Sequence, residues 1–174
     1  MTTDGLTVWL TGLPSSGKTT LALGLSERLR QAGRRVEVLD GDQVRRHLTK
    51  DLGYSRCDRA ENVRRVGFVA HLLSRNGVVA VCALVSPYRQ ERDELRELHG
   101  GRFCEVYLSA PVEVCAERDV KGLYARQRAG ELHGLTGVDD PYEPPLRPDV
   151  VVPTHLQSVD ASLDILWRAV AART

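Results

Sequence analysis

The chain has 174 residues, of which 42% are hydrophobic and 27% are charged, and its formal net charge is +1. These values fit one folded domain over residues 1–174, and they argue against a disordered chain or a dedicated nucleic-acid binder. No apolar run reaches the roughly 18 residues of a membrane span, and the N-terminus does not have the pattern of a secretory signal. We therefore expect a soluble, cytoplasmic domain that binds neither nucleic acid nor membranes.

Short β-branched segments alternate with helical patterns from the start of the chain. Residues 7–10 predict a buried strand, and leucines recur every four residues from Leu21 to Leu29, which predicts a helix that stops at Gly33. Residues 36–39 predict a second strand. Strands that alternate with helices in this way are typical of a parallel sheet.

A long helix and a buried strand are predicted next. Asp58 and Glu61 have the spacing of a capping box, and they predict the start of a helix that ends near Gly77. Residues 78–85 are almost all apolar, as expected for a central strand that is covered on both faces.

The second half continues this alternation and contains one segment of different character. The predicted elements are a helix over 89–98, a strand over 103–108, a short helix through Cys115, a strand over 150–152 and a helix over 159–170. Residues 119–149 are polar and rich in glycine and proline, which indicates either a poorly ordered insertion or a lid over a site. We expect ligands at the carboxyl ends of the strands.

The sequence GLPSSGKT at residues 12–19 matches the G-x-x-x-x-G-K-[ST] pattern in full, between a predicted strand and a predicted helix. Glycines in such a loop let backbone N–H groups point at phosphate oxygens, beside the positive end of the helix. Lys18 is expected to reach the β- and γ-phosphates, and the Thr19 hydroxyl to ligate Mg²⁺. The alternative is a Gly/Ser-rich turn that binds nothing. Both flanking elements fit, and Lys18 is one of only three lysines, so we interpret the loop as a nucleoside triphosphate site.

These features predict a three-layer α/β fold of the P-loop NTPase and kinase type, with a parallel sheet, helices on both faces and a lid over about residues 119–149. The chain has no Asn-Lys pair, so it lacks the guanine-reading segment of a switch GTPase. Its length is too short for a large mechanochemical ATPase. A short chain with a basic lid favours a small-molecule kinase, in which the lid excludes water.

Candidate acceptor residues follow the second and third strands. Asp40 and Asp42 come at the end of the strand over 36–39, where a carboxylate can take a proton from an attacking hydroxyl or help to hold magnesium. A turn that merely closes the strand is the alternative. Arg59 and Asn62 share one helix face, and Arg45 lies upstream. Arginine donates forked hydrogen bonds to phosphate or sulfate, and asparagine can contact a base or a sugar.

The chain resembles the adenylylsulfate kinase family, whose members phosphorylate the 3′-hydroxyl of adenosine 5′-phosphosulfate (APS) with MgATP. The resemblance covers about residues 5–170. Besides the phosphate loop, it rests on LDGD at 39–42, KDLGY at 50–54, DRAENVRR at 58–65, SPYR at 86–89, ERD at 117–119, KGLY at 121–124, RAG at 128–130, GLTG at 134–137 and DDPYE at 139–143. Together these segments are far more specific than the phosphate loop alone.

The resemblance implies a kinase that forms 3′-phosphoadenosine 5′-phosphosulfate (PAPS) and ADP, uses Mg²⁺ with ATP, and is a cytoplasmic homodimer. It implies catalytic roles for Lys18, Asp40 and Ser86, although in-line transfer needs no phosphoserine stage. The implied ATP contacts are Gly12, Leu13, Pro14, Ser15, Ser16, Gly17, Lys18, Thr19, Thr20 and Arg118, with Thr19 as the metal contact through the nucleotide. The implied acceptor contacts are Asp40, Asp42, Arg45, Tyr54, Arg59, Asn62, Val85, Ser86, Lys121 and Leu135.

Four positions depart from the family pattern. Tyr54 and Leu135 stand where the family usually has the two phenylalanines that sandwich the APS adenine, and loss of one stacking ring costs about 1 kcal/mol. Pro14 stiffens the phosphate loop, and His133 replaces a frequent lysine. Leu135 leaves open a kinase for another nucleotide-like acceptor. A non-catalytic nucleotide-binding partner is a further alternative.

Overall fold

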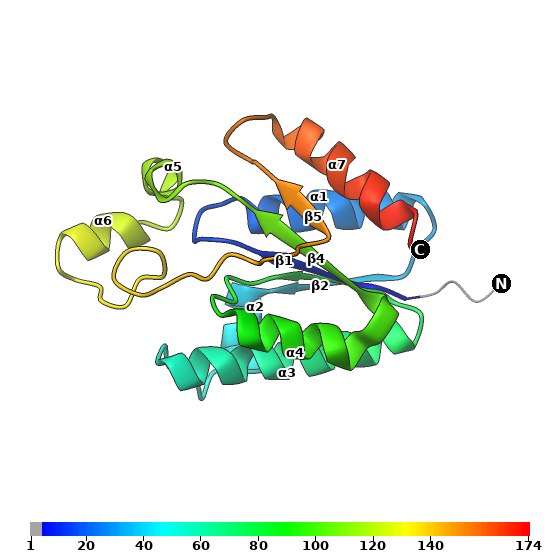
Figure 1. Ribbon diagram of the computed structural model, residues 1–174, viewed down its shortest axis with the longest axis horizontal. Helices are drawn as coiled ribbons and strands as arrows, with labels where there is room; N and C mark the ends of the chain where they lie inside the picture. The colour runs from blue at the N-terminus through cyan, green and yellow to red at the C-terminus, as the bar shows by residue number, and fades with distance from the viewer. Residues whose placement is uncertain (1–4) are drawn as a thin grey trace.

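The computed structural model describes residues 5–174, which contain a five-stranded sheet with helices on both sides (Figure 1). The strands are β1 (Thr7–Thr11), β2 (Val36–Asp40), β3 (Val79–Ala83), β4 (Phe103–Leu108) and β5 (Val150–Val152). They pair in parallel in the order β2-β3-β1-β4-β5. The phosphate loop follows β1, so it lies at the middle of the carboxyl edge of the sheet.

The helices form two layers and an extension. Their bounds are α1 (Lys18–Gln31), α2 (Gly41–His47), α3 (Arg56–Arg75), α4 (Arg89–His99), α5 (Val112–Arg118), α6 (Leu123–Arg128) and α7 (Val159–Ala171), with a 3-10 turn at Gly100–Arg102. In Figure 1, α1 and α7 cover one face of the sheet, α2, α3 and α4 cover the other, and α5 and α6 extend beyond its carboxyl edge. This is the predicted three-layer α/β fold. No helix within residues 5–174 combines the length and apolar character needed to cross a bilayer.

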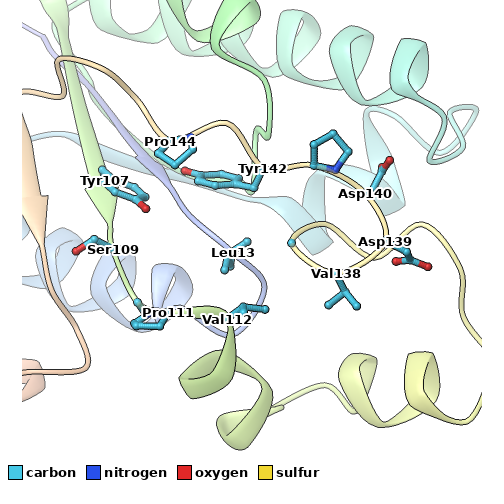
Figure 2. Close-up of a pocket in the computed structure, with 13 residues that line it drawn as sticks. Leu13, Tyr107, Ser109, Pro111, Val112, Val138, Asp139, Asp140, Tyr142 and Pro144 are labelled. Carbon is cyan, nitrogen blue, oxygen red and sulfur yellow. The ribbon is translucent and has the colours of Figure 1, made fainter.

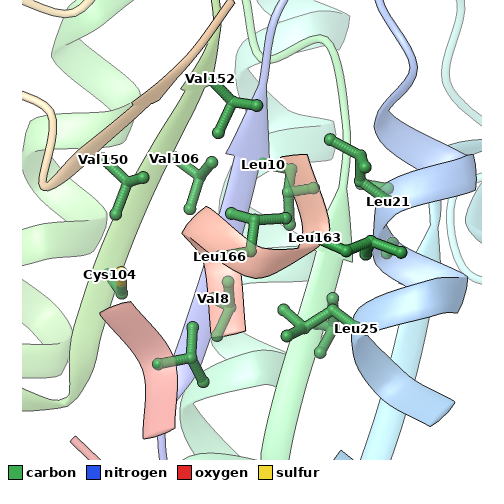
Figure 3. Packing of buried hydrophobic residues seen from close by; sticks show 14 of the residues in the cluster. Val8, Leu10, Leu21, Leu25, Cys104, Val106, Val150, Val152, Leu163 and Leu166 are labelled. Carbon is green, nitrogen blue, oxygen red and sulfur yellow. The ribbon is translucent and has the colours of Figure 1, made fainter. Parts of the chain in front are cut away.

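Alternate residues of β1 face two separate cores, as the two-residue period of a strand requires. Val8 and Leu10 belong to the core beneath α1 and α7, where they pack with Leu25 and Leu166 (Figure 3). Trp9 points to the opposite face and joins the core under α3 and α4. Both faces of β1 are therefore buried, so the strand holds the start of the phosphate loop in a fixed position.

Two helix starts in the structure differ from what the sequence predicted. Asp40 does not close a simple turn, because its side chain accepts a hydrogen bond from Asp42 N (3.1 Å) and caps the short helix α2. Helix α3 begins before Asp58, since the hydroxyl of Ser55 accepts from Asp58 N (3.1 Å). Glu61 instead pairs with an arginine one turn later on the same helix. The capping interaction therefore lies three residues earlier than predicted.

Residues 119–149, here called the lid segment, fold back onto the phosphate loop. The segment contains α6 and a β-bridge between Thr136 and Asp140. Its buried Tyr124 and Leu135 form an apolar cluster, against which Leu13 of the phosphate loop packs. This lid cluster therefore connects the lid segment to the loop through side-chain packing.

Candidate active site

The phosphate loop closes around the ammonium group of Lys18. Lys18 Nζ donates hydrogen bonds to the carbonyl oxygens of Gly12 (2.9 Å) and Leu13 (2.7 Å), and it lies 3.4 Å from Ser16 Oγ. Burial of the ammonium lowers the pKa of Lys18 to about 7. Gly17, with a φ of 103°, turns the chain into α1. The loop thus combines a cation with a helix N-terminus, which is the chemistry of an anion site.

Two neighbouring segments support the loop from outside. The Tyr124 hydroxyl of α6 donates to the carbonyl oxygen of Pro14 (2.9 Å), and the Thr154 hydroxyl donates to that of Ser16 (2.8 Å). Arg118 donates to the carbonyl oxygen of Thr154 (2.8 Å), so this predicted ATP contact lies beside the loop. The sequence interpretation missed Thr154, although a residue two positions after a parallel strand lies where ligands gather.

Asp40 connects the nucleotide side of the site to the acceptor side. Its Oδ1 accepts a hydrogen bond from the Thr19 hydroxyl (2.7 Å), at the first turn of α1. The neighbouring Asp42 forms an ion pair with Lys121, which reaches it from the lid segment. Thr20 is exposed on the next position of α1. The structure therefore brings together the predicted catalytic carboxylate Asp40, the predicted acceptor contact Asp42, the metal-contact hydroxyl and the lid lysine.

Two arginines lie beside the exposed aromatic ring of Tyr54. Tyr54 is 69% exposed, and the guanidinium carbons of Arg45 and Arg59 lie 4.7 Å and 5.7 Å from the centre of its ring. Arg59 also donates to the Gly134 carbonyl oxygen and to Thr136 Oγ1, both at 2.6 Å. This cationic, aromatic corner suits a planar base beside an anionic group.

Two predicted acceptor residues are more enclosed than the sequence suggests. Asn62 is buried, and its Oδ1 accepts a hydrogen bond from Thr49 Oγ1 (2.7 Å). Leu135 is only 6% exposed, because it packs in the lid cluster with Ala110 and Tyr124. In this structure Asn62 Oδ1 is engaged within the protein, and Leu135 presents little surface to a base.

The catalytic role predicted for Ser86 does not fit its surroundings. The Ser86 hydroxyl is buried, accepts a hydrogen bond from Trp9 Nε1 (3.0 Å) and donates to Thr11 Oγ1 (3.0 Å). Thr11 donates in turn to the Val85 carbonyl oxygen (2.7 Å) and bonds the Tyr142 hydroxyl (2.9 Å). A hydroxyl engaged in this buried chain is a structural group, so a phosphoserine role is not retained. Thr11 and Tyr142 were not singled out from the sequence.

A cavity of about 460 Å³ lies beside the phosphate loop (Figure 2). Leu13 and Val138 line it together with Tyr107 and Tyr142, whose stacked ring centres are 6.1 Å apart. Neither Lys18 nor the acceptor-side arginines line this cavity. It is therefore a neighbour of the candidate site and not the site itself.

A family model described as adenylylsulphate kinase matches residues 4–153. The adenylyl-sulfate kinase of Rippkaea orientalis is 53% identical over 168 residues, which cover 97% of this chain and 92% of the relative. That of a Synechococcus species is 52% identical over 99% of this chain and 98% of its own.

Solved structures with the same fold include two APS kinases and one more distant protein. The APS kinase CysC of Mycobacterium tuberculosis, solved with AMPPNP and APS, has a TM-score of 0.91 and 40% identity, over 97% of this chain and 98% of that one. A hexameric APS kinase from Thiobacillus denitrificans has a TM-score of 0.75 and 33% identity, over 98% of this chain and 29% of that one. A gluconokinase from Sinorhizobium meliloti, 20% identical with a TM-score of 0.62, shares the fold.

Proposed function

This chain belongs to the adenylylsulfate kinase family, and from that membership we propose how its side chains perform the reaction. The enzyme uses ATP to phosphorylate the 3′-hydroxyl of APS, and it forms PAPS and ADP. The observation that carries the residue assignment is the 2.7 Å hydrogen bond between Thr19 and Asp40. This contact joins the nucleotide-binding loop to the first residue of the acceptor side.

The nucleotide side stabilises charge on the phosphates of ATP. The backbone N–H groups of the loop and the N-terminus of α1 favour anions, and Lys18 adds a positive charge at the same corner. Arg118 and Thr154 form a rim beside the phosphate loop, and the adenine of ATP would lie against this rim. In this assignment the loop binds the phosphates and the rim orients the base.

The residues present fit a magnesium ion that arrives with the nucleotide. Thr19 Oγ1 and the Asp40 carboxylate are hard oxygen donors, the type that Mg²⁺ prefers. Within residues 5–174, no three His, Cys, Asp or Glu side chains gather into a dedicated metal cage. When bound with ATP, the ion neutralises negative charge on the β- and γ-phosphates.

The acceptor side orients APS and accepts its proton. Asp40 would accept a hydrogen bond from the 3′-hydroxyl and take the proton as the new bond to phosphorus forms. Arg45 and Arg59 would hold the phosphosulfate, with Tyr54 as one stacking surface for adenine. Lys121 of the lid segment would leave its ion pair with Asp42 and bind the transferring phosphate instead. Transfer in line from ATP then requires only positioning, charge stabilisation and exclusion of water.

The domain limits, assembly and location of the enzyme complete the proposal. We infer one domain over residues 1–174, in which residues 119–149 act as the lid. A cytoplasmic homodimer stays a prediction for this chain. The hexameric state is a property of the Thiobacillus denitrificans relative and is not carried over. Sedimentation equilibrium of the purified chain separates a monomer, a dimer and larger assemblies.

The experiment that tests the residue assignment combines acceptor choice with one substitution. MgATP is incubated with APS, AMP or adenosine, and the nucleotide products are separated and identified. A 3′-phosphorylated, sulfate-bearing product with APS alone is expected. In the same assay, Asp40→Ala should lower turnover far more than it weakens ATP binding. Equal losses of turnover and ATP binding would remove Asp40 from the acceptor role.

A further inference from the structure

Arg92 of α4 joins three parts of the molecule from a buried position. The residue is 1% exposed, and its Nε donates to Glu105 Oε1 on β4 (2.9 Å). Its Nη1 donates to the carbonyl oxygen of Ser86, and its Nη2 donates to that of Glu143 (2.5 Å). The guanidinium also lies 5.7 Å from the centre of the Tyr142 ring. One side chain therefore connects the sheet, the end of the strand at the acceptor pocket and the lid segment.

The first connection holds a strained turn. Ser86 has a φ of 42°, in the left-handed region that residues other than glycine seldom adopt. Such a conformation persists only where its surroundings fix it. Arg92 and Thr11 fix it from two sides, because Arg92 binds the Ser86 carbonyl oxygen and Thr11 bonds both the Ser86 hydroxyl and the Val85 carbonyl oxygen. The family resemblance assigns Val85 and Ser86 to the proposed acceptor pocket, so we take this turn as part of its wall.

The second connection holds the end of the lid segment. Glu143 N donates to the carbonyl oxygen of Pro87 (2.8 Å), and the Glu143 carboxylate accepts from Arg89 N (2.9 Å) at the start of α4. Arg89 Nε in turn donates to the Pro144 carbonyl oxygen (2.7 Å). Residues 143–144 are thus fastened to the residues that immediately follow the Ser86 turn. Arg92 closes this clamp from the buried side.

We propose that Arg92 is a positioning residue for the acceptor: it sets the Val85–Ser86 wall and the base of the lid segment in one fixed relation. Because Arg92 is buried, it acts through Ser86 and Glu143 and does not touch either substrate. This inference rests on the proposed acceptor pocket. It predicts that loss of Arg92 impairs APS binding and turnover while ATP binding stays intact.

The shape of arginine explains why this position needs it. Its planar group offers donors in a fixed fork, whereas the lysine ammonium is a single point on a flexible stem. Arg92→Lys therefore keeps the charge beside Glu105 but cannot serve Ser86 and Glu143 at the same time.

Arg96 provides a matched control on the same helix. It binds the same Glu105 (3.1 Å to Oε2) and Asp149 (2.9 Å), but it contacts neither Ser86 nor Glu143. Arg96→Lys thus perturbs the shared ion-pair network without loosening the clamp.

The experiment compares the full-length wild type, Arg92→Lys, Arg96→Lys and Arg59→Ala. For each protein, kcat and the KM values for APS and ATP are measured, with the Tm and hydrogen exchange over residues 84–88 and 140–146. Arg92→Lys should raise the KM for APS about tenfold and lower kcat, with the KM for ATP within about twofold of wild type. It should also speed exchange in both segments. Arg96→Lys should change the Tm alone.

Two results would overturn the inference. One is an unchanged KM for APS in Arg92→Lys while Arg59→Ala raises it. The other is an equal kinetic effect of Arg92→Lys and Arg96→Lys that follows the loss of Tm. If Arg59→Ala also leaves the KM for APS unchanged, the acceptor pocket itself is misplaced. If Arg92→Lys does not fold, Arg92→Gln/Glu105→Gln removes both buried charges, and the same KM split decides the question.

Discussion

The phosphate loop and the lid segment are both polar and rich in glycine, but different kinds of contact hold them. Lys18 binds Gly12 and Leu13, which are six and five positions away in the sequence. The lid segment is held by Arg59, which reaches Thr136 across 77 positions. The half of the site around Lys18 therefore relies mainly on local contacts, although Tyr124 and Thr154 support the loop from 110 and 138 positions away. The acceptor half forms only when distant elements pack. Substitutions in the loop should act on chemistry, and those in the lid contacts should act on acceptor binding.

The largest effect is expected from the local half. Lys18→Ala removes the charge beside the transferring phosphoryl group, and it should lower kcat/KM by roughly 10³-fold. Steady-state PAPS formation measures this loss. Lys50→Ala, which removes an exposed lysine outside the site, should have no effect. A loss of less than about tenfold in Lys18→Ala would contradict the assignment of Lys18 to the phosphates.

A paired substitution separates the two halves of the site. Arg59→Ala removes charged hydrogen bonds to the lid segment and the guanidinium that lies beside the Tyr54 ring. It should therefore raise the KM for APS by about 30-fold. Arg118→Ala should raise the KM for ATP and leave that for APS unchanged. Both values come from varying one substrate at saturation of the other. If each variant affects both substrates equally, the division between a nucleotide side and an acceptor side fails.

The same contrast explains what the sequence could predict. The strand positions, the loop and Lys18 followed from local patterns, and β4 and β5 have the predicted bounds. Strand β3 is shorter than the predicted 78–85. Helix α2 was missed because its cap, Asp40, is also a turn residue. The enclosure of Leu135 depends on a cluster whose members come from separate segments, so no local pattern carried it.

The buried surroundings of Ser86 were also beyond a local pattern. Its hydroxyl partners, Trp9 and Thr11, lie 77 and 75 positions away in the sequence. The resemblance to a family supplied a role for this serine, but only the packed structure shows that its hydroxyl is occupied.

The pKa of Lys18 gives a test that needs no substrate. Burial lowers this pKa to about 7 from 10.5, so the unfolded chain binds more protons than the folded chain between these pH values. The free energy of unfolding contributed by Lys18 therefore increases as the pH rises through this window. The Tm of wild type, relative to that of Lys18→Met, should rise by a few degrees between about pH 7 and 10. Thermal unfolding of both proteins measures it, and parallel curves would contradict a buried ammonium.

The smallest effect is expected at Leu135, which lies in the lid cluster between two residues that bind Arg59. Its side chain fills the lid cluster, while its neighbours Gly134 and Thr136 bind Arg59 beside Tyr54. A phenylalanine ring exceeds the space of a leucine in a filled cluster, which favours its turning toward Tyr54, where it could stack on the APS adenine.

Leu135→Phe should therefore lower the KM for APS about threefold, equivalent to somewhat less than 1 kcal/mol. Leu135→Met, which nearly conserves volume, should leave that KM unchanged. The KM for APS and the Tm of both variants are measured together. If Leu135→Phe lowers the Tm with no change in KM, the ring stays inside the lid cluster. The second stacking surface must then come from another residue, since Tyr54 alone would face the base.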